Sequence, residues 1–152
     1  MNISFREKSL WLEFIATVII FNYYMNQILG FNNTQLADGS LIIGVLFEVV
    51  MYSVVLMIIS SVILAFINHK DADKPLDERE QLIELKGSYY SNWILKVGIV
   101  IAIGQYALES NEWVIGLHQN IPFLPLHILV ISFLLSELAT FFIRIWLSRR
   151  GV

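Results

Sequence analysis

The sequence predicts an all-α integral membrane protein, a four-helix bundle with both chain termini in the cytoplasm. Two observations predict this fold class. Hydrophobic residues make up 57% of the 152 residues, and the mean hydropathy of +0.66 is far above that of a soluble domain. The charged residues, only 15% of the chain, gather in short segments between long apolar runs, which is the pattern that a bilayer imposes.

Four apolar stretches of the chain are candidates for membrane-spanning helices. We place them at residues 10–29, 41–67, 93–108 and 123–147. A spanning helix needs about 20 apolar residues, so the third stretch is short unless residues 88–92 join it. The second stretch is long enough to tilt or to project from the bilayer. Residues 1–152 therefore form a single transmembrane domain, in which residues 68–92 are the one charged connection.

The basic residues fix the expected orientation, because all ten lie on one side of this topology. They are Arg6, Lys8, Lys70, Lys74, Arg79, Lys86, Lys96, Arg144, Arg149 and Arg150. The connections on the other side, residues 30–40 and 109–122, contain no lysine or arginine. The positive-inside rule therefore places both termini and residues 68–92 in the cytoplasm.

Composition also excludes several kinds of site. A net charge of −3 gives no basic field for direct nucleic-acid binding. The chain has no cysteine, which excludes disulfides, thiolate catalysis and cysteine-bound metal centres. His118 and His127 could meet at a metal, but no third ligand is evident. We therefore expect no cofactor and no metal.

The charged connection is predicted to end in a helix that begins near Glu78 and continues into the third span. Asp77 is a good N-cap, and Glu80 follows it three residues later in capping-box register. We expect any kink or break at Gly87. An apolar stripe at helical spacing runs along one face. It is made of Leu82, Leu85 and Tyr89.

The charged residues of this helix form a candidate docking motif for a cytoplasmic regulatory protein. The motif consists of Asp77, Glu78, Arg79, Glu80 and Lys86. Such a mixed-charge face could dock a protein by electrostatic complementarity. The alternative is a solvated extension whose apolar stripe packs on the membrane surface or on the second span.

Polar residues inside the spans form a candidate intramembrane site. Glu48 lies about 10 Å into the second span, and Glu137 lies near the middle of the fourth. Lipid exposure of either carboxylate would cost about 2.5–3.5 kcal/mol, so we expect both to face the bundle or a cavity. With Asn22, Asn26 and Gln105 they could bind a small ligand, a proton or a cation. The alternative is hydrogen bonding between helices, worth about 0.6 kcal/mol per contact.

Small residues that repeat every four positions offer ridges for close helix packing. The ridges are Ser132, Ser136 and Thr140 on the fourth span, Gly98 and Ala102 on the third, and Ser61 and Ala65 on the second. One ridge could serve the monomer and another a homo-oligomer, and the sequence does not assign them.

Residues 77–95, DEREQLIELKGSYYSNWIL, resemble the signature of a family of small bacterial four-helix inner-membrane proteins with a cytoplasmic Asp-Glu-Arg-Glu box. The opening SFREKSLW, residues 4–11, and the closing RRGV, residues 149–152, are also similar to proteobacterial members. Gln81 stands where the family usually has a second arginine, so the charge of the box carries less weight here. The resemblance implies a multi-pass inner-membrane protein whose relatives accompany helix-turn-helix regulators, and it supplies no catalytic residues.

Together these features favour a non-enzymatic sensory or regulatory protein that presents a cytoplasmic helix to a partner. Two alternatives stay open. The first is an oligomeric channel or small transporter that uses Glu48 and Glu137, and the second is a cofactor-binding membrane enzyme subunit. The sequence has no evident nucleophile–base pair, nucleotide-binding loop or haem histidine pair, which favours the non-enzymatic reading. Besides the lipid bilayer, a homo-oligomer and a cytoplasmic regulatory protein are the candidate partners.

Overall fold

The computed structural model describes residues 5–67, 77–109 and 121–150, and these residues form helices and no strands. The predicted all-α fold is therefore confirmed. The helices are α1 (Phe5–Gly30), α2 (Asn33–Leu36), α3 (Gly39–Ile67), α4 (Glu78–Glu109) and α5 (Leu124–Arg150). The short α2 was not predicted, and it forms because Asn32 and Gln35 make a capping box within it.

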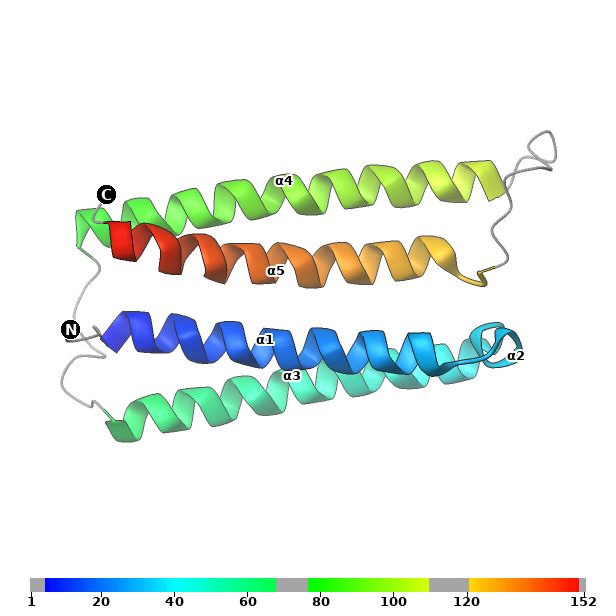
Figure 1. The fold of residues 1–152 in the computed structure, drawn as a ribbon, viewed down its shortest axis with the longest axis horizontal. Helices are drawn as coiled ribbons and strands as arrows, with labels where there is room; N and C mark the ends of the chain where they lie inside the picture. The colour runs from blue at the N-terminus through cyan, green and yellow to red at the C-terminus, as the bar shows by residue number, and fades with distance from the viewer. Residues whose placement is uncertain (1–4, 68–76, 110–120, 151–152) are drawn as a thin grey trace.

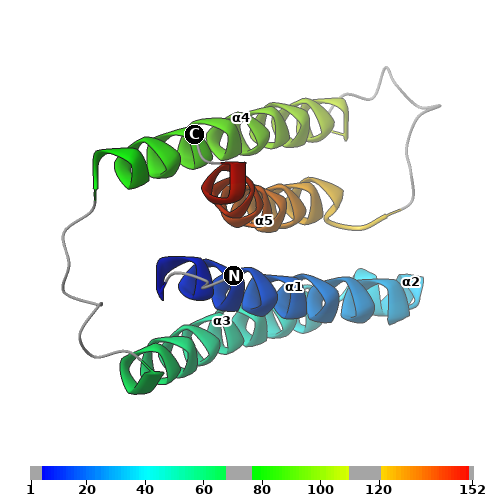
Figure 2. The same cartoon turned by 60° about the vertical axis from the view of Figure 1, so that its left-hand side comes forward.

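The four long helices lie side by side (Figures 1 and 2), and α1 and α4 begin at the end where α3 and α5 finish. We call this end of the bundle the terminal end. α5 packs against α4 on one side and α1 on the other, and α1 packs against α3. The contact between α1 and α5, far apart in sequence, is therefore the seam between an α1–α3 hairpin and an α4–α5 hairpin.

The apolar core lies around this seam. Its buried members come from α1, α3 and α5, and they are Ile20, Tyr24, Val45, Val49 and Leu134. The core is small, because most large apolar side chains lie on the outside of the bundle instead. Val100 of α4 is 69% exposed and Phe47 of α3 is 64% exposed.

Each of the four long helices is long and apolar enough to cross a membrane. An apolar outer surface of this extent would aggregate in water, but in a bilayer it is the surface that lipid solvates. All backbone groups inside such helices are satisfied within the helix, as hydrocarbon requires. The chain is therefore a multi-pass membrane protein with a helical bundle.

Small residues make the close contact between α4 and α5. The Ser136 hydroxyl donates to the Ser91 carbonyl oxygen at 3.0 Å, directly across the two helices. A Cβ atom added at Gly98 would overlap Oγ and Cβ of Ser132, so only glycine allows this approach. The predicted ridge around Ser132 and Ser136 therefore serves the monomer. Ser61 of the α3 ridge is exposed, and its hydroxyl donates to its own helix.

α3 begins at a local cap just outside the apolar span. The Asp38 carboxylate accepts hydrogen bonds from the Ser40 hydroxyl at 2.6 Å and from the Ser40 backbone N–H at 2.9 Å. The Ser40 hydroxyl, followed by its backbone N–H, holds the pKa of Asp38 below its usual value of 3.8. Asp38 also accepts the Ile42 N–H through its carbonyl oxygen at 3.2 Å, which starts the helical ladder.

Candidate functional site

The first turn of α4 has one of the two hydrogen bonds of the predicted capping box, because the Asp77 carboxylate accepts from the Glu78 N–H and not from the Glu80 N–H. The Glu78 backbone N–H donates to the Asp77 carboxylate at 2.8 Å, and the Asp77 N–H donates to the Glu80 carboxylate at 3.0 Å. The Gln81 N–H donates to the Asp77 carbonyl at 2.9 Å, so the helix begins at Glu78 as expected. From there α4 runs without interruption to Glu109, which joins the end of the charged connection and the third span into one helix.

The expected kink or break at Gly87 is wrong. Gly87 lies inside α4 and is buried, and a Cβ atom there would stand 2.7 Å from Cγ of Arg144 and 3.3 Å from the Thr140 carbonyl oxygen. The glycine therefore provides space for an arginine side chain from α5. This is a requirement of packing between two helices, which a helix-breaking propensity does not reveal.

Arg144 uses that space to reach two partners on α4. Its Nη2 lies 3.1 Å from the Ser88 hydroxyl and 3.5 Å from Oε1 of Glu84. Its Nε is buried and has no hydrogen-bond partner among the described residues. Glu84 is 47% exposed, so this ion pair is partly screened by solvent.

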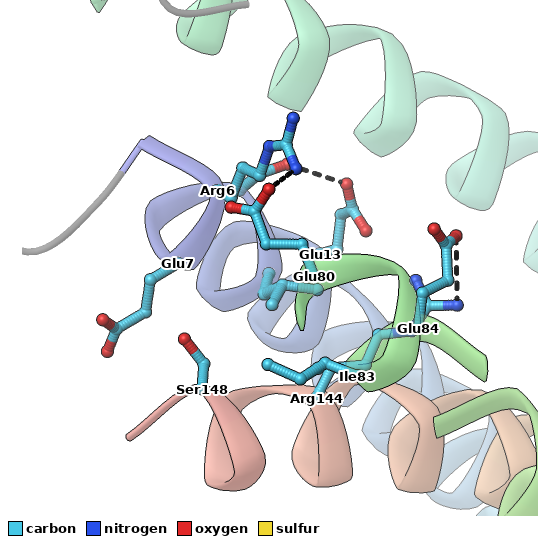
Figure 3. A pocket seen from close by; sticks show the side chains of 10 residues that line it. Arg6, Glu7, Glu13, Glu80, Ile83, Glu84, Arg144 and Ser148 are labelled. Carbon is cyan, nitrogen blue, oxygen red and sulfur yellow. Dashed lines mark hydrogen bonds and ion pairs between the residues drawn. The ribbon is translucent and has the colours of Figure 1, made fainter. Parts of the chain in front are cut away.

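Two further ion pairs join α1 to the other helices at the terminal end, and Figure 3 shows the one between Arg6 and Glu80. Arg6 forms an ion pair with Glu80 of α4, and Nε of Arg149 on α5 lies 2.8 Å from Oε1 of Glu7. The Arg149 guanidinium also lies 5.3 Å from the centroid of the Trp11 ring. The α1 end is therefore tied to both helices of the other hairpin.

These charged side chains surround a pocket of about 240 Å³ between α1, α4 and α5 (Figure 3). Its ionisable lining residues are Arg6, Glu7, Glu13, Glu80, Glu84 and Arg144. Glu13 accepts a hydrogen bond from the Ser9 hydroxyl at 3.0 Å, and its side chain points toward Arg6 in Figure 3. A pocket of this size, with groups of both signs, can hold a small polar molecule. No cluster of metal-ligating side chains occurs within the described ranges.

The predicted docking motif is used largely inside the molecule. Asp77 and Glu80 form the cap, and Glu80 also forms the ion pair with Arg6. The Arg79 guanidinium donates to the Ser148 carbonyl oxygen at 3.1 Å. Glu78 is exposed, while Lys86 is half-buried beside a shallow depression of about 430 Å³ on the outer face of α4. Asp77 and Arg79 are exposed as well, so the charged box and the apolar stripe are both accessible to a partner.

The five intramembrane candidates do not line either of the two described pockets. Glu48 is exposed, which differs from the expected position toward the bundle, and its carboxylate accepts a hydrogen bond from the Tyr23 hydroxyl. Asn22 and Asn26 are exposed on α1. Gln105 of α4 and Glu137 of α5 are half-buried.

The sequence reasoning missed the most buried polar contact of the bundle. The Tyr24 hydroxyl of α1 lies 2.7 Å from Nδ1 of His127 on α5, and the two side chains are 0% and 3% exposed. His127 lies one turn into α5, and from the sequence one can predict only that it is near one end of a span. Its partner depends on how α1 packs on α5, and no spacing in the sequence carries that information.

Comparisons with family models, curated proteins and solved structures found no match to this chain. Its geometry nonetheless defines a distinct region at the terminal end. There the start of α4 forms ion pairs with α1 and α5, and Arg149 of α5 forms an ion pair with Glu7 of α1.

Proposed function

We propose that this chain is a non-enzymatic regulatory protein of the bacterial inner membrane, which senses a membrane condition and presents the start of α4 to a cytoplasmic partner. The length of α4 supports this. Its 32 residues extend about 48 Å, whereas the hydrocarbon core is about 30 Å thick. About three turns therefore project beyond the hydrocarbon, and the placement of all ten basic residues supports a cytoplasmic location for them.

The observation that carries the proposal is an exposed apolar face on these projecting turns. Leu85 is 67% exposed and Tyr89 is 60% exposed, and Leu82, one turn before Leu85, is 44% exposed. The opposite face is occupied, since Ile83 is buried and Gly87 packs against Arg144. An amphipathic helix whose apolar stripe lies outside the membrane core is a common recognition element for partner proteins.

The contacts of α4 supply a route for a signal. Ser91 packs against Ser136 of α5, and Glu80 pairs with Arg6 of α1. A shift of one hairpin against the other along the seam would therefore also move the exposed apolar face at the start of α4, because α4 is one continuous helix. The resemblance of residues 77–95 to an inner-membrane family that accompanies helix-turn-helix regulators supports a regulatory protein as the partner.

Site-specific photo-cross-linking in the producing cell tests this proposal. A photoreactive amino acid at Leu85 should give an adduct with one soluble protein. The yield of this adduct should fall when Tyr89→Arg is added on the same face. Lys8 is the matched control position, because it is exposed near the terminal end but lies on α1. Adducts of equal yield from both positions, or none from Leu85 in folded protein, would reject the proposal.

A further inference from the structure

Glu48 lies at a depth where hydrocarbon surrounds the bundle, although its side chain is exposed. It is nine residues after Gly39, so it lies about 14 Å along α3. The 29 residues of α3 extend about 43 Å, some 13 Å more than the hydrocarbon core. Even if this whole excess projected at the Gly39 end, Glu48 would only reach the boundary of the hydrocarbon. The surface outside it is therefore lipid or another protein.

Glu48 belongs to a polar cluster that bridges α1 and α3. Its Oε2 accepts a hydrogen bond from the Tyr23 hydroxyl, while its Oε1 has no partner among the described residues. The Gln27 side-chain N–H donates to the Tyr23 oxygen at 3.2 Å. The Tyr52 ring meets the Tyr23 ring edge to face, with 5.0 Å between centroids.

Two exposed asparagines lie beside this cluster on α1. Asn26 is four residues after Asn22 and three residues after Tyr23, so its side chain neighbours both on the surface of α1. Asn22 donates one N–H to the Val18 carbonyl oxygen at 3.2 Å, which leaves its second N–H available. Asn26 makes no side-chain hydrogen bond within the described part of the chain.

We call these side chains the polar face, and they are Asn22, Tyr23, Asn26, Gln27, Glu48 and Tyr52. Lipid tails offer no hydrogen bonds, so amides and a carboxylate on a lipid-facing surface are costly and are normally covered by protein. Much of the outer surface elsewhere is apolar, with Val100 and Ile103 of α4 and Phe142 of α5 among its most exposed side chains.

We propose that a second copy of this chain covers the polar face in a symmetric dimer formed through α1 and α3. A two-fold axis along the membrane normal brings identical faces together at identical depth, so a face can complement itself only if it carries both donors and acceptors. This face does. Asn22 lies about 12 Å before the end of α1 at Gly30, which nearly matches the depth of Glu48 on α3.

The partner's amide N–H groups thus meet the free oxygen of Glu48, and each copy repeats the contact. An unrelated membrane protein would have to supply the same donors and acceptors at the same depth, whereas a second copy supplies them without further requirement. The proposed dimer does not depend on the cytoplasmic partner of α4, and separate measurements test the two proposals.

The absence of cysteine makes disulfide cross-linking a direct test, because a disulfide-linked homodimer of a single-cysteine variant can form only through that one position. Asn22→Cys should give disulfide-linked dimers when native membranes are oxidised with copper phenanthroline. Val100→Cys is the matched control, since it lies nine residues before the end of α4 and is 69% exposed on the other hairpin. Equal yields from the two positions would indicate random collision and would overturn the proposal.

Fluorescence energy transfer between labelled copies of the chain, diluted into lipid vesicles, measures dimer formation. It tests the role of Glu48 in a chain that keeps Asn22. Glu48→Leu removes two inter-chain contacts per dimer and should weaken the dimer about eightfold. Glu48→Gln keeps donors and acceptors at the same place and should leave the dimer close to wild type. A monomeric wild-type chain, or a Glu48→Leu variant that dimerises as strongly as wild type, would overturn the proposal.

Discussion

The Tyr24 hydroxyl and Nδ1 of His127 are 2.7 Å apart and form a buried hydrogen bond across the seam between the two hairpins. Apart from this bond, the seam in the membrane is mainly apolar, with Ile20 and Leu134 in its core. The hydrogen bond therefore fixes the register between α1 and α5, because a slide along the helix axis would separate the two groups. Nε2 of His127 is also buried and has no partner among the described residues.

Tyr24→Phe should destabilise the bundle by about 1 kcal/mol, since it leaves Nδ1 of His127 buried without a partner. Tyr106→Phe is the matched control, because Tyr106 is 67% exposed and should cost little. Unfolding of both variants in mixed micelles, with helicity as the signal, measures the difference. A Tyr24→Phe variant as stable as Tyr106→Phe would show that the bond adds nothing to stability.

Gly98→Ala should destabilise the α4–α5 hairpin by about 1–3 kcal/mol, because the added methyl group overlaps Ser132. Gly104→Ala on the same helix is the control, since nothing lies within 4 Å of its added Cβ. The control should be neutral or slightly more stable, as alanine favours helix. Adding Ser132→Gly to Gly98→Ala should recover part of the loss in the same unfolding measurement, and no recovery would contradict the proposed clash.

The predictions from sequence succeeded where the signal was local. Long apolar runs predicted the four spanning helices, and the Asp77–Glu80 spacing predicted the start of α4 at Glu78. A capping box depends only on residues in one turn, and hydrophobic length depends only on the bilayer. Both therefore remain valid whatever the helices pack against.

The contacts between helices could not be predicted in this way. Gly87 was expected to break a helix, but the nearby Arg144 side chain explains why a glycine is needed there. Glu48 was expected to face the bundle, but it pairs with Tyr23 on the outer flank of α1 and α3. The tertiary packing decides which face of a helix meets which neighbour. A helix that is apolar on all sides has no periodicity that would identify this face in the sequence.

The Arg6–Glu80 ion pair should contribute a coupling free energy of about 0.2–1 kcal/mol that decreases in high salt. Glu80 is 38% exposed, so solvent ions screen the pair. A double-mutant cycle with Arg6→Gln and Glu80→Gln measures the coupling, and glutamine at residue 80 keeps an acceptor for the Asp77 N–H. An equal coupling free energy at about 0.05 M and about 0.5 M salt would contradict the expected screening of this ion pair by solvent ions.

Asp38 should titrate below its usual pKa of 3.8 in the folded protein, because the ionised carboxylate accepts both Ser40 hydrogen bonds more strongly than the neutral acid does. A lowered folded pKa means that the cap stabilises α3 above the unfolded pKa and loses that effect as pH falls through the folded pKa. Carbon NMR of aspartate-labelled protein in micelles measures the titration. Ser40→Ala should raise the pKa of Asp38 toward 3.8, and an unchanged pKa in that variant would show that Ser40 is not its cause.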